Sequence, residues 1–259
     1  MPPKKAFISL LRKDEETAKK IMEQVSSYGL TADGHFWSVN MEKMEWIGPR
    51  APLLDPEVAL WIIAGTKQDL ADPNVRFGLS LLSLTVQAAR GHGFPILIVY
   101  AGAAPTVADL PTPLKHADIV AADSSFGPKL VARANIPFKP TPVDYRIDVY
   151  GIPGLGIWLE TGPAKATWKG IMCGVSKGDI NAHGVGPKGN LPAGKMVLNY
   201  AMKGMKLNLS DKEYLAWSVQ NEIDPGTSYF VRITEQPDSI VFGPFAQSGD
   251  AELFVLQIV

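Results

Sequence analysis

The sequence predicts two domains, an α/β domain with a parallel sheet over residues 1–140 and an all-β sandwich over residues 141–259. Three observations lead to this prediction. Short apolar runs alternate with helical patterns in the first half, which is typical of strands and helices in a parallel sheet. The second half has many short β-prone runs separated by Gly, Pro, Asn and Asp. Residues 135–143, between the halves, contain three prolines, which favour an extended connector.

Each element of the first half has its own signal in the sequence. The apolar run over 6–11 predicts a strand. Apolar residues at helical spacing over 14–28 predict a helix that begins with Asp14 as its N-cap. Residues 58–64 are continuously apolar, as is typical of a strand buried on both faces. The other predicted strands are 30–37, 95–101 and 118–122, and the other predicted helices are 75–89 and 124–134.

The second half shows no long helical pattern. Two glycine-rich stretches, 184–189 and 189–195, match phosphate-binding patterns in spacing, but no strand-then-helix context accompanies them. We therefore expect a glycine-rich β-loop there. A single mixed domain over the whole chain is the alternative to two domains. The runs predicted as strands are 146–150, 156–160, 166–175, 196–201, 214–219, 229–234, 239–242 and 252–259.

Composition and charge argue against several classes of function. Lys and Arg total 25 and Asp and Glu total 26, giving a net charge of −1. Binding to nucleic acid or to an acidic membrane would need a local patch, so we expect no nucleic acid and no membrane partner. The single cysteine and four separated histidines favour no metal and no cofactor. No apolar run has the length of a membrane span or secretory signal, and we expect a cytoplasmic protein.

Candidate ligand-binding residues follow from the predicted sheet. In an open parallel sheet, ligands bind beyond the carboxyl ends of the strands, where the strand order reverses. This edge would gather hydroxyl, charged and aromatic side chains, as a sugar or nucleotide pocket does, and its two arginines are suited to clamp a phosphate. An ordinary layer of polar loops is the alternative. The candidates are Ser9, Arg12, Asp33, His35, Trp37, Thr66, Asp72 and Arg76.

Several short motifs of the first half carry a resemblance to known families. A Phe-Ile-Ser strand over 5–9, a charged loop over 13–16 and a helix that ends before Gly29 resemble the opening of a Toll/interleukin-1 receptor (TIR) domain. Residues 72–78 and 88–96 look like a sugar-handling helix and the following strand start of the related nucleoside 2-deoxyribosyltransferases. The resemblance implies a flavodoxin-like fold, a nucleotide-like small molecule as ligand, and pairing into a homo-oligomer.

The chain departs from these families at their decisive residue. Catalytic members carry a glutamate near the start of the helix after the third strand, and the matching position here is close to Gly78. No Asp or Glu occurs from Val75 to Phe94. This predicts a non-catalytic ligand-sensing or protein-interaction module. An N-glycosidase acting on a nucleoside or NAD, with Asp72 in place of the glutamate, is one alternative, and a structural homo-oligomer without a ligand is another.

Overall fold

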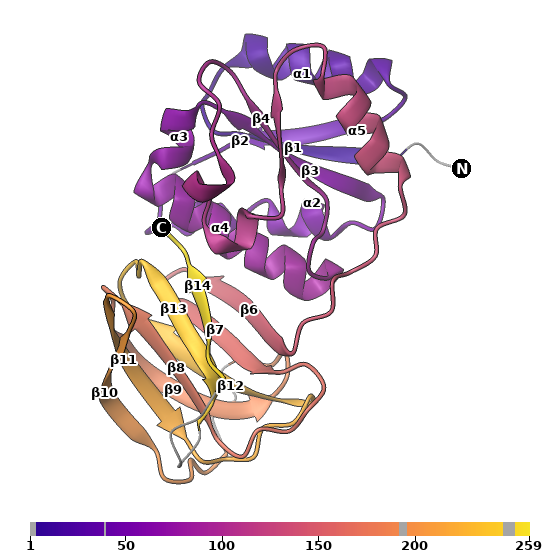
Figure 1. Cartoon of the computed structure of the whole chain (residues 1–259). Coiled ribbons are helices and arrows are strands. Elements are labelled where there is room, and N and C mark those ends of the chain that lie inside the picture. The colour runs from indigo at the N-terminus through magenta and orange to yellow at the C-terminus, as the bar shows by residue number, and fades with distance from the viewer. Residues whose placement is uncertain (1–3, 39, 192–195, 246–251) are drawn as a thin grey trace. The chain divides into compact units, whose positions relative to one another are not determined.

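A computed structural model of the chain describes residues 4–38, 40–191, 196–245 and 252–259. The chain divides into two compact units, Met1–Thr141 and Pro142–Val259 (Figure 1). The first unit holds a parallel sheet and all the described α-helices, and the second holds antiparallel sheets. An α/β unit followed by a β-rich unit is the arrangement that the sequence predicts.

All strands of the first unit are parallel, in the order β2-β1-β3-β4-β5. The apolar strands lie at the centre, because a strand with a helix layer on each face needs side chains suited to burial on both sides. Of the central β3, only Ala59 and Gly65 are not fully buried. The strands are β1 (Lys5–Leu10), β2 (Thr31–Phe36), β3 (Val58–Gly65), β4 (Ile96–Tyr100) and β5 (Asp118–Ala121).

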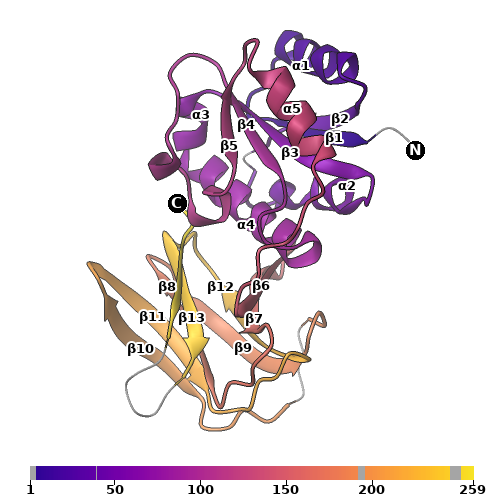
Figure 2. The same cartoon turned by 45° about the vertical axis from the view of Figure 1, so that its right-hand side comes forward.

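Two helices cover one face of this sheet, α1 (Glu15–Ser27) and α5 (Phe126–Asn135) (Figure 2). Asp14 accepts hydrogen bonds from the N–H groups of Glu16 and Thr17 and so begins α1, as the sequence predicts. Strand side chains alternate between the two faces, so alternate residues of β1 reach this layer. The shared core includes Ile8, Leu10, Ile21, Val25, Leu60, Ile62, Leu97, Val99, Phe126 and Leu130.

The long helix α4 (Pro73–Arg90) lies on the other face of the sheet. It contacts α2 (Arg50–Leu54), α3 (Lys67–Ala71) and the 3-10 turns η1 (Glu45–Ile47) and η3 (Thr112–Leu114). A further 3-10 turn, η2, spans Val107–Asp109. Every residue of α4 from Val75 to Gln87 except Arg76 is buried, and the buried polar side chains are satisfied internally. For example, Gln87 Nε2 donates to the carbonyl of Pro113 at 2.8 Å.

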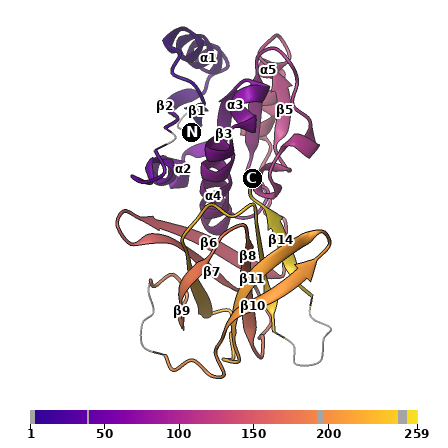
Figure 3. The ribbon, with the colours of Figure 1, turned by 90° about the vertical axis from the view of Figure 1, so that its left-hand side faces the viewer.

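The second unit contains two antiparallel sheets, with strand orders β6-β7-β12-β9 and β10-β11-β8-β13-β14 (Figure 3). Rings from the two sheets meet between them: Tyr145 packs edge-on against Phe242, with centroids 5.2 Å apart. The strands are β6 (Tyr145–Ile152), β7 (Gly156–Pro163), β8 (Ile171–Ser176), β9 (Ile180–Pro187), β10 (Met202–Leu209), β11 (Lys212–Val219), β12 (Thr227–Ile233), β13 (Ser239–Pro244) and β14 (Phe254–Gln257).

Two predictions for this unit are wrong, one of a strand and one of a loop, and the strand predicted over 166–175 begins only at Ile171. The stretch 196–201 is not a strand, and β10 begins only at Met202. The side chain of buried Asn221 accepts from the N–H of Asn199 and donates to the carbonyl of Val197, so these backbone groups do not pair with another strand. Conversely, much of the glycine-rich 184–189 belongs to β9, whose Gly184 lies opposite Phe230 of β12. Part of the second glycine-rich match, 192–195, lies outside the described residues.

A buried carboxylate ties three segments of the second unit together. Glu160 of β7 is 4% exposed and accepts hydrogen bonds from the hydroxyls of Tyr150 and Ser228 and from the N–H of Gly189. The guanidinium of Arg146 lies 3.7 Å away. A buried charge costs free energy unless it is paired and hydrogen-bonded, and this carboxylate meets both conditions.

None of the described helices is long and apolar enough to cross a membrane. In the described part of the chain, no group of three or more His, Cys, Asp or Glu side chains is placed to hold a metal ion. Cys173 is fully buried in β8, and burial raises the pKa of its thiol to about 12. At neutral pH this thiol is protonated and out of contact with solvent, so it is not a nucleophile.

The stability of the second unit should fall in acid because of His183. Burial, with a smaller effect of Lys203, lowers the pKa of half-buried His183 from 6.5 to about 4. Between these values the unfolded chain binds a proton that the folded chain does not, so the free energy of unfolding falls as the pH falls. We expect this residue to contribute at most about 1–2 kcal/mol, since water screens a half-exposed ring.

Denaturant unfolding at pH 7 and pH 4.5 checks this expectation, with His183→Gln as the comparison. The variant loses the hydrogen bond to the Tyr229 hydroxyl at both pH values. It should nevertheless lose less stability than the native chain on acidification. An equal loss in the two proteins would show that His183 titrates normally.

Candidate functional site

The carboxyl edge of the parallel sheet has a cavity at the point where the strand order reverses. The chain passes from β1 to β2 on one side of β1 and then to β3 on the other. Open parallel sheets bind ligands at such a switch point. The cavity there has a volume of about 190 Å³. Its apolar lining includes Leu10, Ile21, Ala64, Val99, Ala101 and Ala122, and its polar lining is Arg12, Asp14, Thr17, Thr66 and Asp69.

Arg12 and Asp69 form an ion pair at this cavity. Arg12 follows β1 and donates from Nη2 to Oδ1 of Asp69 at 2.8 Å; its side chain is 68% exposed, against 10% for Asp69. The other oxygen of Asp69 accepts from both the N–H and the hydroxyl of Thr66. Thr66 is the N-cap of α3, and Asp69 completes its capping box. The start of α3 therefore fixes the carboxylate, and the carboxylate orients the guanidinium.

Both carboxylates that line the cavity are ionised at neutral pH. Burial acts to raise the pKa of Asp69, but hydrogen bonds from Thr66 and the guanidinium of Arg12 outweigh it and hold that pKa below its usual value. Hydrogen bonds from Thr17 lower the pKa of Asp14. The described lining thus carries two negative charges and one positive charge. This balance disfavours a phosphate inside the cavity.

The predicted site residues do not all gather at this cavity. Arg12 and Thr66 line it, whereas the other six candidates do not. Asp33 and His35 were candidates for the ligand-binding edge, but both lie within β2, inside the strand predicted over 30–37. Pairing of β2 with β1 continues to Phe36, with His35 opposite Ser9, so neither residue extends beyond the end of the strand. Asp33 is exposed on this edge strand.

Ser9 and His35 form a hydrogen bond that joins β1 and β2. The Ser9 Oγ lies 2.9 Å from the Nε2 of His35 and accepts from the indole Nε1 of Trp61 at 2.9 Å. A serine beside a histidine is the spacing of a nucleophile and its base. Ser9, however, is 0% exposed, so no substrate reaches its hydroxyl. Burial lowers the pKa of His35, so its ring is neutral near pH 7. Its role here is structural, since it holds β2 to β1 through the bond with Ser9.

Trp37 packs against Gly78, the position where the families that the sequence resembles carry a glutamate. A Cβ placed on Gly78 would lie 2.8 Å from Cζ2 of Trp37 and 3.1 Å from Cβ of Trp46. Both tryptophans are more than nine-tenths buried, and their indole N–H groups make no hydrogen bond to the described residues. Packing of the two rings therefore leaves no room for a carboxylate at position 78.

Asp72 and Arg76 lie at the start of α4 and make structural contacts there. Asp72 is its N-cap and accepts from the N–H groups of Asn74 and Val75. Arg76 donates to the backbone carbonyl of Asp109, whose carboxylate pairs with Lys67 at 3.0 Å. Arg76 and Arg12 thus bind different partners, and only Arg12 lines the cavity. The expected phosphate clamp of two arginines is not assembled.

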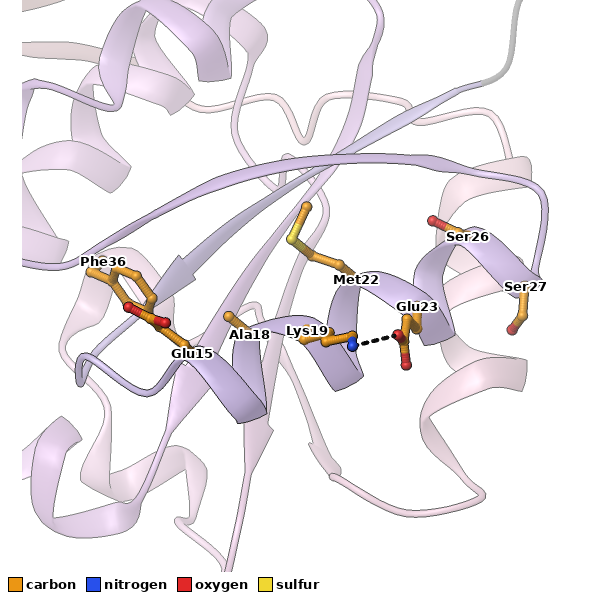
Figure 4. A pocket seen from close by; sticks show the side chains of 8 residues that line it. All are labelled: Glu15, Ala18, Lys19, Met22, Glu23, Ser26, Ser27 and Phe36. Carbon is orange, nitrogen blue, oxygen red and sulfur yellow. Dashed lines mark ion pairs between the residues drawn. The ribbon is translucent and has the colours of Figure 1, made fainter.

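A wider hollow lies beside α1, on the side of Phe36 of β2 (Figure 4). Its volume is about 760 Å³, and it is lined by seven residues of α1 together with Phe36. Met22 projects into it beside the ion pair of Lys19 and Glu23, whose side chains are 77% and 66% exposed. Exposed pairs of this kind contribute little energy, and none of the predicted site residues lies in this hollow.

Three polar residues of the cavity, Asp14, Thr17 and Asp69, were not predicted as site residues. Asp14 was expected only as an N-cap. The sequence signal for Asp69 is the spacing Thr66-x-x-Asp69, which is that of a capping box just after a buried strand. Comparison with known proteins adds nothing to these assignments: no protein-family model matches the chain, and no curated protein matches it.

The close packing at Gly78 predicts an unusual response to substitution. Replacing a helical glycine with alanine ordinarily stabilises a protein. We expect Gly78→Ala to lower the free energy of unfolding by about 1–3 kcal/mol, because the new methyl overlaps a rigid, buried ring. Gly184→Ala is the control, since nothing lies within 4 Å of its added Cβ. Denaturant unfolding measures both variants, and stabilisation by Gly78→Ala would contradict the close packing.

Proposed function

We propose that the first unit is a non-catalytic ligand-sensing module with a flavodoxin-like, TIR-like fold. The strand order β2-β1-β3-β4-β5 is the order of flavodoxin-like sheets, which supports the finer fold assignment. The observation that carries the functional proposal is the cavity at the switch point between β1 and β3. Its ligand is a nucleotide-like small molecule that enters from the carboxyl edge.

The size and charge of the cavity define which part of such a ligand it holds. A cavity of about 150 Å³ accommodates a six-membered ring, so one of about 190 Å³ holds a single ring. Thr17 and Thr66 supply hydroxyls and Arg12 supplies N–H donors, which suit the hydroxyls of a sugar. With two carboxylates in the lining, any phosphate of the ligand stays outside, on the side of exposed Arg12.

The carboxylates that line the cavity argue against a catalytic reaction there. Asp69 and Asp14 each accept three hydrogen bonds, and both have lowered pKa values. A carboxylate of low pKa is a weak general base, and one held by three donors is a poor nucleophile. Position 78, where the families that the sequence resembles carry a glutamate, is a glycine packed against Trp37 and Trp46.

A second candidate function is N-glycosidic cleavage of a nucleoside or NAD. One observation favours it: ionised Asp69 and Asp14 line a ring-sized cavity, and a nearby carboxylate stabilises the positive charge that develops on a ribose. Asp72 is not such a residue, because it caps α4 and does not line the cavity.

Binding can be tested with adenosine and adenosine monophosphate as probes. We expect adenosine to shift backbone amide resonances of residues 10–17 and 64–69 in a nuclear magnetic resonance titration, and to bind at least as tightly as its phosphate ester. Ala122→Leu narrows the cavity and should weaken binding by about 10-fold or more. Ala104→Leu, at an exposed position outside the lining, is the matched control. Shifts elsewhere, or equal binding by both variants, would refute the site.

A further inference from the structure

A second cavity of the first unit, with a volume of about 360 Å³, lies at the opposite edge of the parallel sheet. This is the edge where strands begin and helices end. Lys4 precedes β1 and Val58 begins β3, while Arg90 ends α4 and Arg133 belongs to the last turn of α5. All four residues line the cavity. None of them was a candidate site residue, because they are far apart in the sequence and follow no motif.

Positive charge predominates in this cavity. Lys4, Arg90 and Arg133 come from three separate segments of the chain, and Glu57 is the one acidic side chain among the described residues that line it. Arg133 is paired with Asp118 outside the lining. Unlike Arg133, neither Lys4 nor Arg90 is paired with a carboxylate in the described part of the chain. Each donates its hydrogen bonds there to backbone carbonyls.

Lys4 and Arg90 each have N–H groups that no hydrogen bond found for the described residues uses and that are available to a ligand. Lys4 Nζ donates to the carbonyl of Ala134 at 2.6 Å, which uses one of its three N–H groups. Arg90 donates three hydrogen bonds, to the carbonyls of Leu53, Asp55 and Val58, out of five N–H groups. These bonds fix both cations in place without neutralising them. Burial lowers the pKa of Arg90, against an opposing effect of nearby Asp55.

The rest of the lining is apolar and aromatic. The guanidinium of Arg90 lies over the ring of Phe94, 4.6 Å from its centroid. Phe138 packs edge-on against the same ring, with centroids 6.0 Å apart. Ala59 and Ile136 also line the cavity, and Ile136 is 63% exposed. An apolar wall beside two fixed cations matches a molecule that has a hydrophobic body and one anionic end.

We propose that this cavity binds a small carboxylic acid with an apolar, ring-sized body. Lys4 and Arg90 hold the carboxylate by charge-assisted hydrogen bonds, and Phe94, Phe138 and Ile136 cover the body. This site is separate from the cavity at the carboxyl edge. The two differ in the sign of their charge, because the lining there contains two carboxylates and one guanidinium.

Phenylacetate and phenylacetamide are the probes that test this proposal, because they share a body and differ in the charge of one end. Titrations of the full chain are followed by backbone amide resonances. We expect phenylacetate to shift resonances of residues 57–59 and 133–138 and to bind about 10-fold more tightly than the amide. Lys4→Met should weaken binding of phenylacetate by about 5- to 10-fold. Lys165→Met, an exposed lysine of the second unit, should not change it.

The phenylacetate titration tests this proposal separately from the proposed ligand site at the carboxyl edge of the sheet. Equal affinity for acid and amide, unchanged binding by Lys4→Met, or shifts confined to residues 10–17 and 64–69 would each overturn the proposal. Absence of binding by phenylacetate up to its solubility limit would overturn it too. Lys4 is exposed, so its replacement tests charge without emptying the core. The adenosine titration is independent, since it reports on the other edge of the sheet.

Discussion

The contact of α4 with Trp37 and Trp46 is the constraint on which the first unit depends. It exists because residue 78 has no side chain: a Cβ there would lie 2.8 Å from the ring of Trp37. Through this contact the loop after β2 packs over the helix and closes one face of the sheet. Two buried indole N–H groups without partners among the described residues make the arrangement costly, by about 1–3 kcal/mol for each group. Tight ring packing offsets this cost and removes the place for a catalytic glutamate.

The packing leaves the two edges of the sheet open, and the edges differ in chemistry. At the carboxyl edge, helix starts bring capping carboxylates such as Asp14 and Asp69 to the cavity. At the amino edge, helix ends attract cations such as Lys4 and Arg90, which bind the last carbonyls. The helix dipole explains both preferences. Opposite charges at opposite edges therefore follow from the way a parallel sheet arranges its helices, and they suit different ligands.

The sequence predicted the elements better than it predicted the sites. Continuous apolar residues identified β3 within one residue, and an N-cap with helical spacing identified α1. Such signals are local. The pairing of Arg12 with Asp69 joins residues 57 positions apart, and the cavity of Lys4, Arg90 and Arg133 joins three distant segments. The strand predicted over 30–37 is confirmed by β2, but its position in the sheet was not predicted: His35 lies opposite Ser9 of β1, inside the pairing of the two strands rather than beyond its end.

The central claim is that the first unit recognises a ligand without transforming it. The most direct test is incubation of the chain with NAD and a panel of nucleosides, followed by chromatography for free base. The account predicts no release above the uncatalysed rate, because loss of a positioned charge costs on the order of 10²–10³ in rate and loss of a nucleophile costs more. Release of base that Asp69→Asn or Asp72→Asn abolishes would contradict the account and establish an N-glycosidase.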